Sequence, residues 1–145
     1  MLAARYAFDP DDFDPDDIAA FLALPPRKHD GLALRHVIEP RHESFRDERF
    51  FDLPLRHDAA VVSGDDEESP CRDADTASFA YACVQRMREE VATSYDEPAL
   101  VAFGKRARRW ASAGRDSYIF MINGPKLRAP AAASALQQRL GIAPA

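Results

Sequence analysis

The chain has 145 residues, 46% of them hydrophobic and 30% charged, which suits one soluble domain with a sizeable core. The formal net charge of −5 offers no basic footprint for nucleic acid. No apolar run approaches the roughly 18 residues of a membrane span, and the N-terminus lacks the pattern of a secretion signal. Cys71 and Cys83 fit neither a zinc site nor a disulfide framework. We therefore expect one cytoplasmic domain over residues 1–145.

The first elements are marked by their boundary residues. Residues 1–13 show no complete strand. A helix is expected to begin at Pro15, with Asp14 as its N-cap and acidic residues against the helix dipole. Pro25-Pro26 ends this helix, because the residue before a proline avoids helical backbone.

A short strand over residues 34–39 follows, and the pattern then predicts a second helix from about Phe45. Ser44 is the expected N-cap of that helix. Pro54 lies within its apolar pattern, where a proline costs about 3 kcal/mol relative to alanine. The second helix is therefore expected to stop near Asp52 or to kink.

The second half of the chain alternates between strands and helices. Its expected elements are a strand at 59–62, an acidic loop at 63–78, a strand at 79–84, a helix opened by Asp96 and stopped by Gly114, a strand at 118–122 and a helix at 129–140. The strand at 118–122 is almost wholly apolar, which is typical of a parallel strand buried on both faces. The alternation predicts an α/β fold with a parallel sheet.

The stretch from Val37 to Phe45 carries most of the chemistry that the sequence offers. Glu39, Arg41 and His42 follow a short apolar run, in the strand-to-helix loop that often holds catalytic groups. The alternative is a structural Glu39–Arg41 ion pair with a solvated His42. A weaker alternative is a metal site of Glu39 and His42, with His36 as a further ligand, but strand alternation turns His36 to the opposite face from Glu39. No metal site is therefore predicted.

Several motifs together resemble the YecE-like family, also called domain of unknown function 72. Residues 37–45 resemble its Glu-x-Arg-His-x-Ser-aromatic motif. Further matches occur in the family's order along nearly the whole chain, at Asp9–Leu24, Phe79-Ala80-Tyr81, Tyr95-Asp96, Trp110, Asp116–Asn123 and Ala129–Leu140.

The resemblance implies a partial TIM-type (β/α) barrel with parallel strands, about four strands and four helices. The Gly-Thr-Ser-Gly-Trp-like strand that opens the family's barrels has no counterpart here, so the chain is expected to be a truncated, C-terminal part. The family's Tyr-x-Arg-Leu-His-Gly strand end has also changed. Its arginine, histidine and glycine are replaced by Cys83, Gln85 and Arg86.

The resemblance brings no established reaction, so the function is unknown and the sequence leaves open whether the chain is an enzyme. We expect a truncated barrel without intact catalysis of its own. The alternative is a hydrolase- or lyase-like TIM-barrel enzyme for a phosphate- or sugar-containing ligand. In it Glu39 is a base or metal ligand, Arg41 an anion clamp and His42 an acid–base partner. Asn123 is then a positioning amide. No cofactor is assigned.

A partial barrel leaves open sheet edges, which pair readily with other strands. The expected partners are therefore a second copy of the chain or a complementary N-terminal barrel fragment. Neither nucleic acid nor a membrane is expected as a partner.

Overall fold

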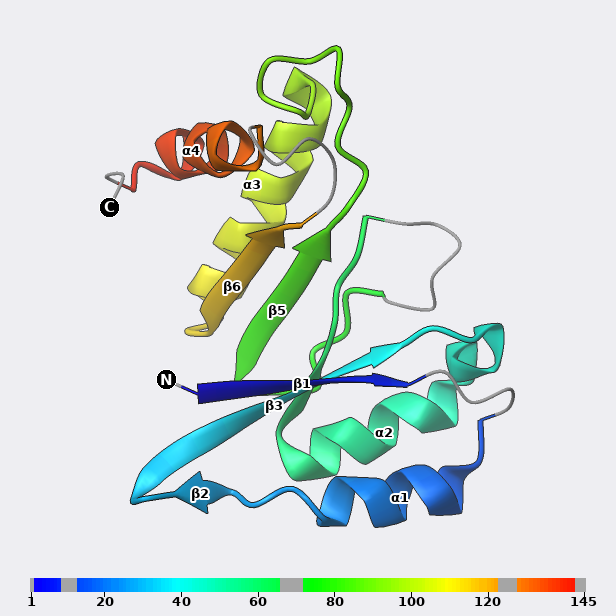
Figure 1. The fold of residues 1–145 in the computed structure, drawn as a ribbon. Helices are drawn as coiled ribbons and strands as arrows, with labels where there is room; N and C mark the ends of the chain where they lie inside the picture. Colours follow the sequence, from blue (N-terminus) through cyan, green and yellow to red (C-terminus); the bar gives the residue numbers. More distant parts are fainter. Residues whose placement is uncertain (1, 9–12, 66–71, 123–127, 143–145) are drawn as a thin grey trace. The chain divides into compact units, whose positions relative to one another are not determined.

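A computed structural model describes the chain at residues 2–8, 13–65, 72–122 and 128–142 (Figure 1). The chain divides into two compact units, Met1–Tyr81 and Ala82–Ala145. Strand β5 (Phe79–Val84) crosses from one unit to the other. In the described ranges no helix has the length and apolar character of a membrane-spanning segment.

The first unit holds four strands, two α-helices and one 3-10 helix ahead of β5. They are β1 (Leu2–Phe8), α1 (Pro15–Ala23), β2 (Lys28–His29), β3 (Leu32–Pro40), the 3-10 helix η1 (Glu43–Arg46), α2 (Glu48–His57) and β4 (Ala59–Val61). Together β1, β2, β3 and β4 form one sheet, in which β3 pairs with all three others.

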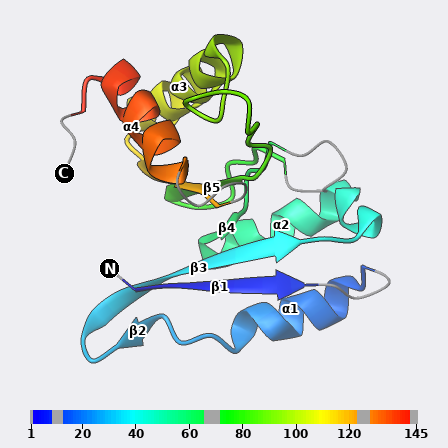
Figure 2. The ribbon, with the colours of Figure 1, turned by 45° about the horizontal axis from the view of Figure 1, so that its top comes forward.

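Strand β3 pairs in parallel with β1 and with β4, and it forms a hairpin with β2. The β1 register runs from Leu2 opposite Leu34 to Phe8 opposite Pro40. Figure 2 shows β1 and β3 side by side and pointing the same way. The α/β fold class with parallel strands is therefore confirmed, although the described strands form two small sheets rather than a closed barrel.

The prediction that residues 1–13 contain no complete strand is wrong. Residues 2–8 form β1, which pairs with β3 over its whole length. The sequence Leu-Ala-Ala-Arg is poor in β-branched residues, so its local propensity for strand is low. Residues 2–8 form a strand because they pair with β3, which is distant from them in the sequence.

The second helix begins later than predicted, and of the two predicted outcomes at Pro54 the stop near Asp52 does not occur. Asp47, not Ser44, caps α2, and its carboxylate accepts a hydrogen bond from the Arg49 amide at 2.9 Å. The helix continues past Asp52 to His57 with Pro54 inside it. The Pro54 side chain is fully buried, so its packing offsets the lost backbone hydrogen bond.

Aromatic side chains fill the core of the first unit. Phe50 of α2 lies edge-on to Phe45 and Phe51, with ring centroids 5.1 and 5.2 Å apart. Ile38 of β3 and Ile18 of α1 belong to the same buried cluster. The core therefore joins the sheet to the two helices that lie side by side in Figure 1.

The second unit contains the end of β5, α3 (Glu97–Ser112), β6 (Asp116–Met121) and α4 (Ala129–Leu140). Asp96 caps α3 through the Ala99 amide at 3.1 Å, and Gly114 follows the helix at a φ of +72°. Trp110 is buried in the core. Strands β5 and β6 form a two-stranded sheet.

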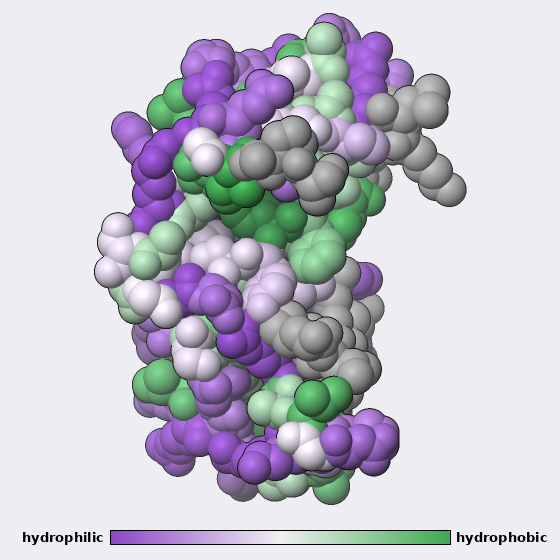
Figure 3. Space-filling model, turned by 90° about the vertical axis from the view of Figure 1, so that its left-hand side faces the viewer, coloured by the Kyte–Doolittle hydropathy of each residue, from purple (hydrophilic) through white to green (hydrophobic). Residues whose placement is uncertain are grey.

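The prediction that the last strand is buried on both faces is wrong. Every residue of β6 is exposed or half-buried, and the relative exposure is 43% at Phe120 and 44% at Ile122, the residue after the strand. Figure 3 shows apolar side chains gathered around a hollow of the second unit. The apolar side chains of β6 are therefore more exposed in the second unit than their sequence predicts.

Replacing Phe50 with alanine should remove most of the stability of the first unit. A buried Phe→Ala change costs about 3–5 kcal/mol, against a typical net stability of about 5–15 kcal/mol. Leu55→Ala is the matched control, because Leu55 lies on the same helix with 56% of its surface exposed. Urea unfolding followed by circular dichroism measures both. Equal losses in the two variants would contradict this assignment of the core.

Candidate functional site at the end of strand β3

The carboxyl end of β3 carries the three charged or polar residues that the sequence singles out in the first unit. Glu39 is the penultimate residue of the strand, and it is 4% exposed. Arg41 is the first residue beyond the strand, and His42 caps η1. Because β1, β3 and β4 are parallel, their carboxyl ends share one edge of the sheet.

Glu39 and Arg41 form an ion pair of unequal exposure. A guanidinium nitrogen of Arg41 lies 3.7 Å from Oε1 of Glu39, and the two side chains are 54% and 6% exposed. This distance is longer than a hydrogen bond. The guanidinium of Arg41 therefore lies next to the buried carboxylate, while about half of the Arg41 side chain is exposed.

His42 has a local role that its position in the sequence does not reveal. Its Nδ1 lies 3.3 Å from the Ser44 amide nitrogen and 2.9 Å from the Ser44 hydroxyl oxygen. A backbone N–H can only donate, so Nδ1 accepts and the ring proton lies on Nε2. His42, rather than Ser44, is thus the cap of η1, and in this tautomer its Nε2–H is a hydrogen-bond donor.

The other candidate residues do not join this cluster. Nε2 of His36 lies 2.9 Å from the carbonyl oxygen of Pro26. His36 and Ile38 line a small cavity of about 20 Å³ together with α1 residues, so both point to the helix side of β3. Asn123 lies outside the described residues. Across the described ranges no three His, Cys, Asp or Glu side chains come together as a metal site.

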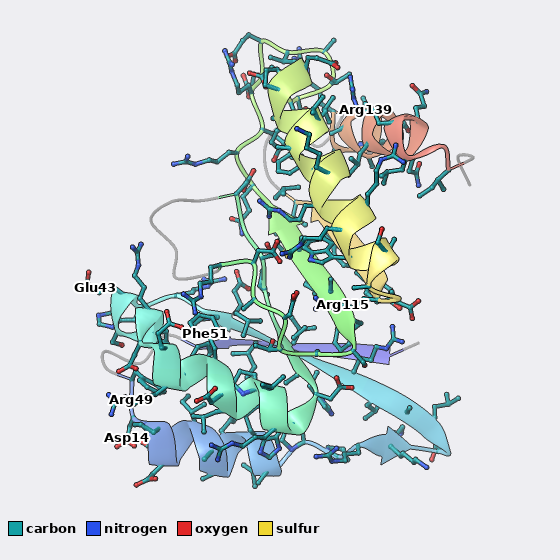
Figure 4. All side chains as sticks on the ribbon, turned by 180° about the vertical axis from the view of Figure 1, so that it is seen from behind. Asp14, Glu43, Arg49, Phe51, Arg115 and Arg139 are labelled. Atoms are coloured by element: carbon teal, nitrogen blue, oxygen red, sulfur yellow. The ribbon has the colours of Figure 1, made fainter. Side chains whose placement is uncertain are left out.

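Two arginine–carboxylate pairs hold the start of α2 next to this site, and neither was predicted. Arg49 contacts Asp47 through Nε and a terminal nitrogen at 2.6–3.1 Å. Arg72 makes two parallel bonds of 2.7 and 2.6 Å to Glu48, and its guanidinium also lies 3.8 Å from the centre of the Phe51 ring. Figure 4 shows Glu43, Arg49 and Asp14 at the end of the unit where η1, α2 and α1 begin.

These pairs shift the titration of both carboxyl groups in the same direction. Hydrogen bonds from the Arg49 side chain and amide lower the pKa of Asp47. The Arg72 side chain lowers the pKa of Glu48 in the same way. Both carboxylates therefore stay ionised to lower pH in the folded chain than in the unfolded one.

The cluster combines three complementary binding groups. Glu39 offers a carboxylate that accepts hydrogen bonds from hydroxyl groups, Arg41 offers a planar cation, and His42 offers an N–H donor. A ligand that has both hydroxyl groups and an anionic group matches this set.

The parallel strands, the helices between them and the polar groups at a strand end define an α/β protein with a candidate binding edge. The chain matches the family described as "Protein of unknown function DUF72" over residues 5–145, and it belongs to this family. The YecE-like resemblance of the sequence is thereby confirmed, since both names denote one family. The family description assigns no activity.

Among solved structures, the chain is similar to a DUF72 family protein from Thermotoga maritima, with a TM-score of 0.65 and 19% sequence identity. The match covers 93% of this chain and 55% of that protein, so the chain spans just over half of the length of this relative. No curated protein matches the chain.

The pH dependence of stability should reveal the Asp47 pair. A folded-state pKa below the ordinary value of 3.8 adds stability that is present above that value and is lost as pH falls through the lowered pKa. Asp47→Asn keeps a capping side chain but removes the titrating group. Urea midpoints should therefore fall less in this variant than in the unmodified chain on going from neutral pH to pH about 3.

Asp52→Asn is the control for this measurement, because Asp52 is an exposed carboxylate of the same helix. The acid-induced loss of stability should be smaller in Asp47→Asn than in Asp52→Asn, because Asp52→Asn keeps the Asp47–Arg49 pair. An identical loss in the unmodified chain and in Asp47→Asn would contradict a stabilising Asp47–Arg49 pair.

Proposed function

We propose that the carboxyl end of β3 binds a sugar phosphate, and that this chain contributes a binding edge of a TIM-type barrel rather than catalysis of its own. The reaction class of the family is unknown, so the proposal concerns recognition. The observation that carries it is the buried Glu39 carboxylate next to the exposed Arg41 guanidinium.

Charge at this position is costly for folding, which supports a role in binding. A buried carboxylate loses hydration that an ion pair only partly restores, and apolar residues of similar size often stabilise a fold as well or better. Glu39 lies at the end of a central strand, where α/β proteins place their ligands. A buried carboxylate next to an exposed arginine is typical of a preorganised binding site.

The two halves of a sugar phosphate match the two halves of the cluster. Arg41 has five donors in a plane, which suits the oxygens of a phosphate group, and the Nε2–H of His42 adds one more donor. Glu39 accepts hydrogen bonds from sugar hydroxyl groups. We also propose Asn123, which lies outside the described residues, as a positioning amide.

The barrel itself is part of this proposal. Parallel pairing of β1, β3 and β4 and the similarity to the Thermotoga maritima structure both support it. That structure includes a large share of chain with no counterpart here. We therefore keep the interpretation that residues 1–145 act as one domain and that further strands, from a second copy or a complementary fragment, complete the barrel.

The changed end of β5 supports the proposal of binding without turnover. The family resemblance implies an arginine and a histidine where this chain has Cys83 and Gln85. The Cys83 side chain is 1% exposed, so its thiol is inaccessible to a ligand. This buried cysteine forms no disulfide, which fits the reducing cytoplasm in which we place the protein.

The alternative function is a hydrolase- or lyase-like activity in which Glu39 acts as a base. The position of Glu39 favours this alternative, since it lies at the carboxyl end of a parallel strand, where TIM-type enzymes place catalytic residues. The tautomer of His42 argues against a second base at this position, because its Nδ1 is occupied by Ser44. Release of phosphate from glucose 6-phosphate by the purified chain, lost in Glu39→Gln, would favour the enzyme.

Calorimetric titration of the purified chain with glucose 6-phosphate tests the binding proposal. Arg41→Ala should weaken binding by at least about tenfold, because a hydrogen bond to a charged group contributes about 1.5–3 kcal/mol. Arg56→Ala, which removes an exposed arginine from the last turn of α2, should leave the affinity unchanged. Glucose and inorganic phosphate should each bind more weakly than the combined ligand.

Three results would contradict the proposal. The first is no heat of binding with glucose 6-phosphate. The second is equal loss of affinity in Arg41→Ala and Arg56→Ala, which would indicate unspecific attraction of the phosphate to positive charge. The third is equal affinity for glucose 6-phosphate and inorganic phosphate, which would show that the sugar is not recognised.

A further inference from the structure

The second unit contains a groove bounded by one strand and two helices. Strand β6 contacts both α3 and α4, and the two helices contact each other. Between them lies a groove of about 610 Å³, which is within the usual range of about 300–1,000 Å³ for ligand pockets. Figure 3 shows apolar side chains gathered around this hollow. All of its lining residues belong to the second unit, so this unit alone forms the groove.

Aliphatic side chains form most of the groove. Ile119 and Met121 line it from one face of β6, and Leu136 and Leu140 line it from α4, one helical turn apart. The α3 side includes alanine residues such as Ala111, whose short side chain leaves the space open. None of the described residues that line the groove is aromatic. The lining therefore suits a flexible aliphatic chain better than a flat ring, which would stack on aromatic side chains.

The backbone around the groove favours an acyl chain over a peptide. Within α3 and α4 the backbone N–H and C=O groups bond to each other along the helix, so these walls offer few backbone partners to a ligand. A peptide in the groove would leave some of its own backbone polar groups unpaired, which is unfavourable. An acyl chain has no such groups along its length.

The charges of the second unit favour an anionic ligand. Residues 82–145 contain ten Lys or Arg and five Asp or Glu, a formal charge of +5 within a chain of net charge −5. The charged residues that line the groove are Arg108, Arg115 and Asp116, so the lining also has a positive formal charge. The guanidinium of Arg108 donates to the carbonyl oxygen of Arg139, which does not neutralise its charge. A carboxylate at Arg108 would therefore be complementary in charge.

We propose that this groove binds a free straight-chain fatty acid, with the acyl chain against β6 and the carboxylate at Arg108. Burial of the methylene groups supplies most of the affinity, and Arg108 sets the preference for an anionic head group. Gln137 lines the same groove, and its amide is a second donor for the carboxylate. The inference uses neither the β3 site nor the pairing edge of β6, so it stands apart from the proposed function.

Calorimetric titration of the purified chain with decanoate, below its micelle concentration, tests this inference. Decanoate should bind saturably, with one molecule per chain. 1-Decanol has the same chain length without the charge, and it should bind about twofold to fivefold more weakly, which is the effect of an exposed ion pair. Octanoate lacks two methylene groups, so its affinity should be lower by up to about tenfold.

Two matched pairs of variants in α3 locate the site. Arg108→Ala should abolish the preference for decanoate over 1-decanol, whereas Lys105→Ala, which removes an exposed charge of the same helix outside the groove, should keep it. Ala111→Phe should weaken the binding of both ligands by at least about tenfold, because the ring occupies space that the acyl chain needs. Ala102→Phe places the same ring at an exposed position of α3 outside the groove, so it should bind both ligands normally.

The readout for Arg108 is the ratio of the two affinities, because a loosened α4 would weaken the binding of both ligands alike. If Ala111→Phe loses its helical circular dichroism, Ala111→Leu takes its place. The inference is overturned by the absence of saturable decanoate binding, or by equal affinity of the unmodified chain for decanoate and 1-decanol. Equal effects within either pair of variants would also overturn it, since they would indicate unspecific attraction to the basic unit or to apolar surface elsewhere.

Discussion

The hydrogen bonding of β3 within its sheet is the constraint on which the first unit depends. β3 is the strand that pairs with β1, β2 and β4, and its last five residues are all buried. Parallel pairing along its length fixes the strand direction, and the packing of Ile38 against the helices fixes which face points to the core. These two constraints bring Glu39 to the end of the sheet, with Arg41 and His42 directly beyond it. The positions of Glu39, Arg41 and His42 thus follow from the pairing and packing of β3 alone.

Capping residues and glycines in the sequence predicted the helix ends that depend only on neighbouring residues. Asp14 and Asp96 cap α1 and α3 as expected, and Gly114 and Gly141 follow α3 and α4 with positive φ. The wrong predictions concern strands whose structure or burial depends on residues far away in the sequence. The residues of β1 have no strand pattern of their own and depend on pairing with β3. An apolar strand sequence such as that of β6 predicts burial, but it does not identify the element that packs against the strand.

The candidate site was also predictable only in part, because some of its contacts join neighbouring residues and others join distant ones. Glu39 and Arg41 are two residues apart at a strand end, so their ion pair could be anticipated from the sequence. The cap formed by His42 depends on a side-chain rotamer that no sequence pattern reports. The bond between Arg72 and Glu48 joins residues 24 positions apart, and the acidic stretch before Arg72 gave no indication of it. Side-chain roles were therefore harder to foresee than positions.

Ligand recognition at the end of β3 is the central claim, and amide NMR spectra of the chain with glucose 6-phosphate test it most directly. The ligand should shift the amide signals of residues 39–44, where the Glu39 carboxylate, the Arg41 guanidinium and the η1 cap lie together. Saturating shifts confined to residues 39–44 are the predicted result. Spectra that do not change, or shifts centred on other elements, would contradict the account.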